Sequence, residues 1–470
     1  MKNIHTILSK VLTILFFVSV VSCQDLEETP LGISTSSNFY TTPAQCEAAY
    51  AASLNDLINM WSGYENIFGL FPDGHHEWET LNFGADYGAD VYKLHFSALK
   101  NINAVLKAVK AGNLKSYPDN IPDINGQGKF LRAYNYFTLV RLFGGLPYIN
   151  EDTPDVVSNP LTPEDRLTVA ACYENIVKDL EFAIANLNDF DSSTPAKPNK
   201  WTAKALLAKV YITMATAPLN QTANYAKARD LANDVIENGP YSLVDKIEDV
   251  FKTSNKNNSE MIFCFQSTPD DARSPGASYA PTEYDGWGSG PALTGWVEAF
   301  PEQPRKYNYI MVNWHETIYD LSSPMIHYTE SADGIPFMGK YNYPNLSYDE
   351  QLGYSLMNIP ILRLADVYLL YAEAANMANG APTQLAVDRL NKIIERANGD
   401  SGTEEKATIS MSKEAFDTKV IDERSYELCF EFDRVFDVFR KRLLDKVMEE
   451  ATLPDFNPED YLFPIPSYDA

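Results

Sequence analysis

The sequence predicts a mainly α-helical protein, a tetratricopeptide-like scaffold of helical pairs that carries a loop-rich, aromatic-rich insertion. Three observations support this. Apolar residues recur every three or four positions through residues 43–239 and again through most of 351–470. Residues 201–239 have the length and the helix, turn, helix layout of a tetratricopeptide unit. Residues 240–350 are instead rich in Pro, Gly and Tyr and show no sustained helical period. We expect the C-terminal helices to complete the same domain as the first helical region.

The scaffold helices follow from the apolar spacing. The first begins near Pro43, a residue suited to the first helical turn, and its apolar stripe continues to Trp61. A second pattern fills residues 91–109 and stops near Gly112. Further helices are predicted at about 130–143, 169–187, 203–214, 225–236, 362–379 and 382–398, with a long helix after Ser412. Short polar or Gly- and Pro-containing connectors separate them, so we expect a right-handed α-helical stack.

The insertion, residues 240–350, is the first place to expect a ligand. Its clearest regular element is a strand at Glu260–Gln266, and three of the six tryptophans of the chain lie within it. Long irregular segments in a compact protein tend to carry function, because a rigid scaffold positions them while their own residues are free to vary. We therefore expect residues 240–350 to be the ligand-binding segment.

The N-terminus has the profile of an export signal. Two lysines are the only charges before Cys23, and residues 11–21 are apolar apart from one Thr and one Ser. The apolar run is too short to span a bilayer, which takes about 20 residues, and the tetrapeptide VVSC that ends at Cys23 resembles a bacterial lipobox. That resemblance implies a signal peptide over 1–22, a lipidated thiol at Cys23 and a tether over 23–42. An ordinary secretory signal with an incidental cysteine is the alternative.

The charge of the chain narrows its partners. The net charge is -26, and removal of residues 1–22, which contain two lysines and no acid, makes it -28. Such a surface repels phosphate backbones and anionic lipid, so we expect no nucleic-acid partner and membrane attachment by the lipid anchor only. Asp25, Glu27 and Glu28, just after Cys23, also look like the export signal of surface lipoproteins in some double-membrane bacteria.

The sequence contains none of the common catalytic or metal-binding motifs. His75 and His76 adjoin Glu77, but no H-x-x-x-H or Cys pair completes a coordination set. No G-x-S-x-G nucleophile elbow and no P-loop lysine occurs. We expect no metal, no cofactor and no enzymatic activity. The remaining cysteines form no C-x-x-C pair and have apolar neighbours, which favours buried free thiols and leaves disulfides open: Cys46, Cys172, Cys264 and Cys429.

Five stretches, together with the lipobox, resemble the SusD/RagB family of surface nutrient-binding lipoproteins. They are FLRAYNYFTLVRLFGGLPYI from Phe130, YENIVKDLEFAIANL from Tyr173, LRLADVYLLYAEAAN from Leu362, IDERSYELCFEFDR from Ile421 and YLFPIP from Tyr461. Family members are similar in being helical, tetratricopeptide-like proteins that cap a TonB-dependent (SusC-like) outer-membrane transporter. They present it with ligand, usually a glycan, so the resemblance implies an outer-membrane, cell-surface lipoprotein of starch or polysaccharide utilisation.

The resemblance has two gaps. After FDVFR the chain continues with Lys441, Arg442 and Leu443, where the family often shows a tryptophan, and residues 268–348 match no family motif. The identity of the glycan is therefore not implied. A peptide-binding surface receptor or scaffold stays an alternative, and a helical glycoside hydrolase a weaker one.

Charged residues within the matched motifs have a structural explanation. They are embedded in aromatic helices, where ion pairs that lock one helix to another are expected. We assign this role, ahead of ligand contact, to Arg132, Arg141, Arg363, Asp366, Glu423, Arg424 and Glu427.

The aromatic residues divide into core and ligand candidates. Trp61 and Trp296 fall on apolar helix stripes, and Trp201 opens a helix beside apolar partners, so we expect all three to pack in the core. The candidate sugar platforms are Trp78, Trp287 and Trp314, with nearby hydrogen bonds from Tyr284, Asp285 and Asn308. Loop tryptophans also pin loops to a core, and alternation with its neighbours could place Trp314 inside.

Overall fold

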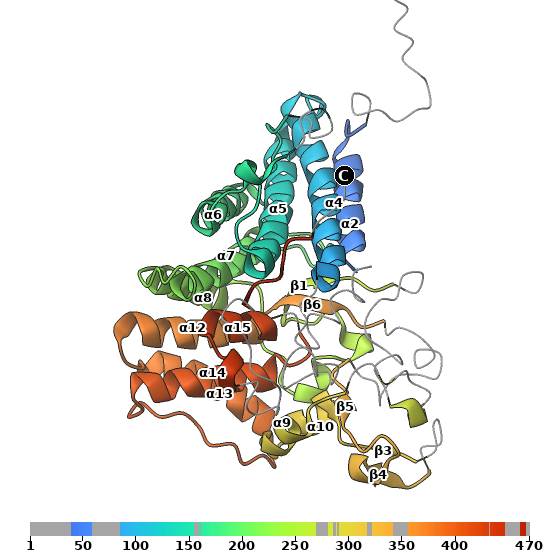
Figure 1. Ribbon diagram of the computed structural model, residues 1–470, viewed down its shortest axis with the longest axis vertical. Helices are drawn as coiled ribbons and strands as arrows, with labels where there is room; N and C mark the ends of the chain where they lie inside the picture. The colour runs from blue at the N-terminus through green and yellow to red at the C-terminus, as the bar shows by residue number, and fades with distance from the viewer. Residues whose placement is uncertain are drawn as a thin grey trace, which may run out of the picture. The chain divides into compact units, whose positions relative to one another are not determined.

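The computed structural model gives the positions of most of the chain. It describes residues 39–58, 85–154, 158, 161–268, 281–284, 288, 291–316, 322–341, 356–431, 433–446 and 461–466. Residues 40–470 belong to one compact unit. The scaffold helices are α2 (Pro43–Ile58), α4 (Ala85–Lys110), α5 (Ile121–Phe143), α6 (Val169–Asn186), α7 (Lys200–Ala215), α8 (Asn224–Asn238), α12 (Leu364–Asn379), α13 (Gln384–Asn398), α14 (Lys413–Glu427) and α15 (Arg434–Lys441) (Figure 1).

Consecutive helices pack on one another along the chain. Helix α4 contacts α2 and α5, α6 contacts α5 and α7, and α8 packs on α7. The insertion then separates α8 from α12 in sequence, yet these two helices lie side by side, and α12 packs in turn on α13 and α14 (Figure 1). The predicted mainly helical fold is confirmed, whereas tetratricopeptide geometry of the pairs stays a prediction. In the described part of the chain no helix is both apolar and long enough to cross a membrane.

Side-chain caps explain where several of these helices begin and end. Thr168, Asn199, Thr383 and Ser412 each accept a hydrogen bond from a backbone N–H in the first turn of the helix that follows. Helix α12 ends at Gly380, whose φ of 77° is in the left-handed region that glycine adopts without strain. Residues next to the helix ends therefore determine several boundaries of the helical scaffold.

Helix α5 begins at Ile121, well before Phe130, where its apolar pattern starts. Two glycines lie in this first part, and one of them is required by packing. A Cβ at Gly128 would lie 2.3 Å from Tyr50 Oη and 2.8 Å from Leu106 Cδ2. Only glycine lets α2 and α4 approach α5 so closely, so the residue that weakens the helical signal is the one the packing needs.

The insertion contains short elements on a core of its own. Strand β1 (Met261–Phe265) confirms the predicted strand and pairs antiparallel with β6 (Ile359–Arg363), which the sequence pattern did not reveal. Its other elements are α9 (Thr294–Ala299), α10 (Pro304–Tyr309), β2 (Ile310–Met311) paired with β5 (Phe337–Met338), and β3 (Asn313–His315) paired with β4 (Met325–His327). These elements enclose a second hydrophobic cluster, separate from that of the helices.

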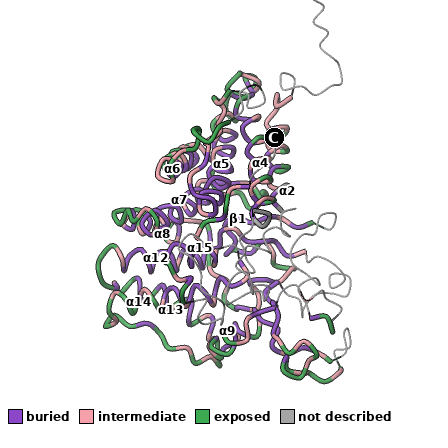
Figure 2. Tube along the Cα trace, in the orientation of Figure 1, coloured by how far each residue is buried: buried purple, intermediate pink, exposed green. Residues whose placement is uncertain are grey.

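Figure 2 shows the buried residues running through the helical stack and into the insertion. Trp201 is buried among the helices, and Trp296 packs against Phe300, so both are core residues as predicted. Trp61 lies outside the described residues. The four cysteines expected as buried thiols are all buried and free, and none of them forms a disulfide: Cys46, Cys172, Cys264 and Cys429.

Buried ion pairs join the helices, as predicted for the charges of the matched motifs. Arg132 of α5 pairs with Asp179 of α6, with Nε 2.7 Å from Oδ2 and Nη2 2.8 Å from Oδ1. Arg424 of α14 lies 2.7 Å from both Asp437 of α15 and Asp366 of α12. Each pair is hydrogen-bonded on more than one side, the condition under which a buried ion pair is tolerated.

Candidate functional site

Buried charges fix the insertion to the C-terminal helices. Arg305 of α10 is fully buried and forms a two-pronged pair with Glu423 of α14, at 2.6 and 3.1 Å, while its Nη1 lies 2.8 Å from Glu427. Lys340, after β5, donates to the Glu427 carbonyl at 2.7 Å and lies 2.6 Å from Glu431. Buried ion pairs and hydrogen bonds therefore hold the insertion on the C-terminal helices.

Glu427 is the centre of these contacts. Its side chain also contacts Arg363 of β6 and Arg396 of α13, at 2.7 and 2.6 Å. Burial alone would raise the pKa of Glu427, but the surrounding cations, Arg396 first among them, hold that pKa well below its usual range. The carboxylate thus stays charged and links four elements of the fold.

The structure corrects one member of the predicted ligand set. Trp314 lies in β3 but is only 3% exposed, and its ring packs edge-on against Phe337 in the core of the insertion. Alternation along the short strand turns Trp314 inward, while its neighbours Asn313 and His315 lie on the other face. Trp314 is therefore not an exposed platform for a sugar.

Two of the other candidates can be placed. Asn308 lies in α10, partly buried, and its amide nitrogen donates to the Pro304 carbonyl at 2.9 Å, while none of the described residues donates to its amide oxygen. Tyr284 closes a short 3₁₀ turn that begins at Thr282. Cys23, Trp78, Asp285 and Trp287 lie outside the described residues, so the structure does not show whether the set comes together.

The turn at Thr282 is tied to the loop after β4. Thr282 Oγ1 donates to Asp333 Oδ2 at 3.0 Å, and the Ala332 N–H donates to Glu283 at 2.5 Å. The stretch that carries Tyr284 therefore lies beside residues 332–333.

One exposed aromatic residue of the insertion was not among the ligand contacts predicted from the sequence. Tyr307 of α10 is 52% exposed, and its hydroxyl donates to Glu302 at 2.6 Å. That hydrogen bond and partial burial raise the pKa of Tyr307, whereas bonds from Lys306 and Tyr307 lower the pKa of Glu302. A fixed ring edged by a carboxylate suits the faces and hydroxyls of a sugar. In the sequence, Tyr307 directly follows Arg305 and Lys306. The structure shows that those two residues are buried and that Tyr307 points outward, which the sequence pattern did not reveal.

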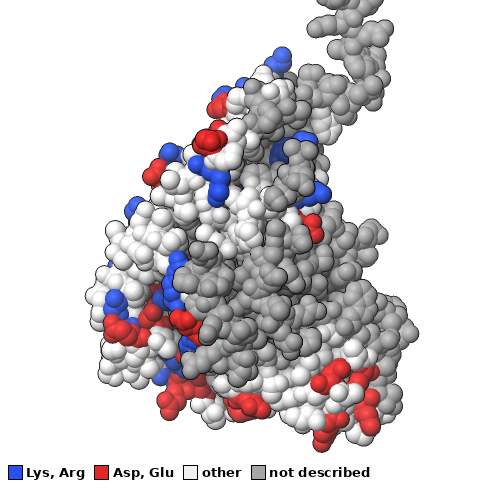
Figure 3. All heavy atoms as spheres, viewed as in Figure 1, with Lys and Arg blue, Asp and Glu red and all other residues white. Residues whose placement is uncertain are grey.

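Acids outnumber bases among the exposed charged residues described in the insertion. Figure 3 shows acidic side chains along the lower edge of the described surface. Exposed acids of this segment include Glu283, Glu298, Glu302 and Glu330. Such a surface disfavours an anionic ligand. No group of three or more His, Cys, Asp or Glu side chains suited to a metal occurs within the described ranges.

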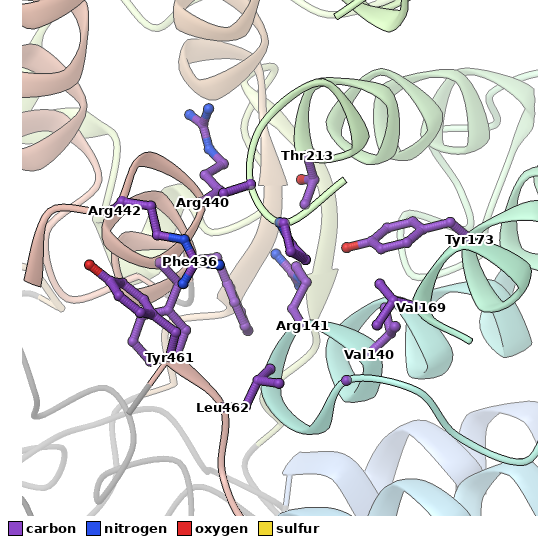
Figure 4. A pocket seen from close by; sticks show the side chains of 14 residues that line it. Val140, Arg141, Val169, Tyr173, Thr213, Phe436, Arg440, Arg442, Tyr461 and Leu462 are labelled. Atoms are coloured by element: carbon purple, nitrogen blue, oxygen red, sulfur yellow. The ribbon is translucent and has the colours of Figure 1, made fainter. Parts of the chain in front are cut away.

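A separate pocket lies among the helices, where α5, α6, α7 and α15 meet residues 461–462 (Figure 4). Its volume is about 160 Å³. The Arg141 guanidinium is stacked between two rings, 3.7 Å from the Phe137 centroid and 3.4 Å from that of Phe436. Arg442 lies over the Tyr461 ring at 4.0 Å. The sequence motifs pointed to ion pairs here and gave no sign of a cavity.

Comparisons with known proteins cover most of the chain. A family model described as "SusD family" matches residues 284–461, and one described as "Starch-binding associating with outer membrane" matches residues 33–212. SusD-like protein P2 of Formosa agariphila is 28% identical, over 97% of this chain and 96% of that protein. A SusD superfamily structure from Parabacteroides distasonis is 25% identical, with a TM-score of 0.66 over 81% of this chain and 83% of its own.

Two further solved structures share the fold and have titles that mention a glycan. One, solved with a xylogluco-oligosaccharide, is 22% identical with a TM-score of 0.70, over 90% of this chain and 95% of its own. The other is titled a laminarin-binding SusD-like protein and is 21% identical with a TM-score of 0.67, over 90% of this chain and 96% of its own. At this identity these two likenesses establish the fold alone.

Proposed function

Since the chain belongs to the SusD/RagB family, we propose that it binds a glycan at the cell surface and passes it to a TonB-dependent, SusC-like outer-membrane transporter. The observation that carries the binding role is the insertion itself. Its frame is held by buried ion pairs of Arg305 and Lys340, while Tyr307 and its carboxylate partner Glu302 remain exposed. Fixed aromatic and polar groups on a rigid frame are what a sugar-binding surface needs.

The organisation of the chain follows the same proposal. Residues 1–22 act as the signal peptide, and 23–42 form a tether lipidated at Cys23. Residues 43–239 are the helical scaffold, 240–350 the ligand-binding segment, and 351–470 complete the domain. The description of the matched family as associated with the outer membrane supports this placement, and several acyl chains on Cys23 would hold the protein there durably.

The glycan contacts we propose are Trp78, Tyr284, Asp285, Trp287 and Asn308, with Tyr307 added and Trp314 removed. Because acids outnumber bases among the exposed charges described in the insertion, we propose that the ligand is an uncharged glycan and not a sulfated one or a uronate. The glycans named for the structural neighbours and in the family description, namely xylogluco-oligosaccharide, laminarin and starch, are all uncharged.

Calorimetry with the mature chain tests this proposal. The titrants are xylogluco-, laminari- and malto-oligosaccharides, a uronate oligosaccharide and a basic peptide. For the glycan that binds, Trp287→Ala and Tyr307→Ala should each weaken affinity by about 1 to 3 kcal/mol. Tyr117→Ala, which removes a ring 39% exposed on the connector between α4 and α5, is the control and should bind like the parent.

Three results would overturn the proposal. Binding of the basic peptide with no glycan bound would favour the receptor alternative. Release of reducing sugar from any bound glycan would show a hydrolase. Full affinity in both the Trp287 and Tyr307 variants would place the site elsewhere.

A further inference from the structure

The pocket between α5, α7 and α15 has the features of a second binding site, independent of the proposed glycan surface. Among the described residues its lining includes three arginines, Arg141, Arg440 and Arg442, and no Asp or Glu. The whole chain, in contrast, has 64 acidic and 38 basic residues. A lining of one sign, opposite to that of the protein, points to an anionic ligand.

The three arginines differ in how far they are neutralised. Arg440 is paired with Glu373 on both terminal nitrogens, at 2.5 and 2.7 Å. Arg141 lies 3.9 Å from Asp433. Arg442 is exposed, and within the described part of the chain no oxygen accepts a hydrogen bond from its guanidinium. Arg442 therefore brings the least compensated charge to the pocket.

The backbone at Arg442 is also unusual. Its φ of 56° and ψ of 50° are left-handed, a conformation uncommon for a residue with a side chain. Such outliers gather at functional sites, where other interactions compensate for their cost. Here the conformation ends α15 and accompanies the stacking of Arg442 on Tyr461 (Figure 4).

A tyrosine lines the pocket from α6. The Tyr173 residue is 2% exposed, and none of the described residues forms a hydrogen bond with its hydroxyl. That hydroxyl is free to bond a ligand in the pocket. In Figure 4 the Tyr173 hydroxyl points into the pocket from the side opposite Tyr461 and Arg442.

The remaining lining is apolar and sets the size of the ligand. Val140, Val169, Phe436, Phe439 and Leu462 form most of it. A dry apolar cavity of about 150 Å³ accepts benzene, and this pocket measures about 160 Å³. We propose that it binds a small organic acid, whose carboxylate pairs with Arg442 and whose ring-sized apolar body packs on Phe436 and Phe439.

Titration of the mature chain with benzoate, followed by ligand-observed NMR and calorimetry, tests this inference, with benzyl alcohol as the uncharged analogue. Benzoate should bind saturably and at least about ten-fold more tightly than benzyl alcohol. Arg442→Gln should weaken benzoate about ten-fold, and Val169→Phe, which fills the pocket, should abolish binding. Arg229→Gln, at an arginine outside the lining, is the matched control and should leave the affinity unchanged.

Three outcomes would overturn the inference: no saturable binding of benzoate, equal binding of benzyl alcohol, or unchanged benzoate affinity in the variants. Arg442 is exposed, so its variant is expected to fold. If Val169→Phe does not fold, Arg442→Gln alone decides. A glycan titration of the Arg442 variant should match that of the parent, which separates this site from the glycan surface.

Discussion

At the scale of single residues, burial in the structure confirms the predictions for two tryptophans and corrects that for a third. Trp201, Trp296 and Trp314 all sit in apolar patterns, and all three pack in a core. The sequence could assign the first two because each has apolar partners at helical spacing. Trp314 lies in a strand of three residues, and so short an element leaves the direction of its side chains open. Its burial comes from tertiary packing on Phe337, which no local pattern contains.

Glu373 tests the buried ion pairs. It is fully buried between Arg440 and Lys441. Burial alone would raise the pKa of Glu373, but these cations lower that pKa to about 2. Glu373→Gln should cost about 3 to 5 kcal/mol near pH 7, because it leaves buried cations without their partner.

The loss of stability caused by Glu373→Gln should become smaller at low pH. A carboxyl with a lowered folded-state pKa stabilises the fold fully above its unfolded pKa, near 4.5, and loses this contribution as the pH falls towards 2. The gap in urea midpoint between parent and Glu373→Gln should therefore narrow between pH 5 and pH 3. A gap that stays constant would contradict the assignment. Glu395→Gln, which breaks an exposed pair with Lys406, should change stability by about 0 to 1 kcal/mol.

At the scale of elements, the apolar periodicity predicted the long helices. It did not predict the short strands or the start of α5, which depend on packing against other parts of the chain. Strand β6 runs directly into α12, so its apolar residues continue the helical pattern and hide the boundary at Arg363. Strands β2 to β5 have two or three residues each, too few for an alternating pattern. The start of α5 was missed because glycine argues against helix locally, whereas here it permits close packing.

Gly128 makes this packing testable. Gly128→Ala should destabilise the protein by about 1 to 3 kcal/mol, because the new methyl would overlap Tyr50 and push it from its hydrogen bond to the Ile124 carbonyl. Thermal or urea unfolding measures the effect. Gly295→Ala in α9, where an added Cβ meets nothing within 4 Å, should be neutral or slightly stabilising. Equal stability of the two variants would show that α2 can shift away from α5.

Arg305 tests whether the insertion is held by its buried charges. Arg305→Met leaves Glu423 and Glu427 without a buried cation that each now contacts. Hydrogen exchange should then speed up in α10 and β2, while α6 keeps its protection. Arg132→Met is the reciprocal control and should loosen α5 and α6 but not α10. Uniformly faster exchange in both variants would mean that neither pair acts locally.

At the scale of the whole molecule, the sequence motifs predicted the family and the fold. They did not predict which residues form the proposed ligand surface. Most of the matched residues lie in helices of the scaffold, where their charges form ion pairs. The ligand segment carries no comparable motif, and its exposed groups, such as Tyr307, become visible only when the buried face of α10 is known. The sequence thus predicts which segment binds the ligand, and the structure adds Tyr307 to the residues proposed for its surface.

Attachment to the membrane depends on one residue in our account. Cys23→Ala should release the protein from the membrane fraction and abolish lipid labelling, because no other anchor is proposed. Cell fractionation and metabolic labelling with a fatty acid measure both effects. Membrane association and labelling that persist in the variant would contradict the lipidation of Cys23.

A stable complex with the transporter is the second expectation at this scale. The protein, purified from detergent-solubilised outer membranes, should bring a TonB-dependent transporter with it. Repeated isolation of the intact lipidated protein without such a partner would argue against its role as a lid.

The most direct test of the central claim is hydrogen–deuterium exchange of the mature chain with and without the glycan that binds. Our account predicts that added glycan protects peptides of residues 240–350, those containing Tyr307 and Trp287 above all, while the helices α2 to α8 exchange as before. Protection confined to those helices, with the insertion unchanged, would contradict it and place the binding surface on the scaffold.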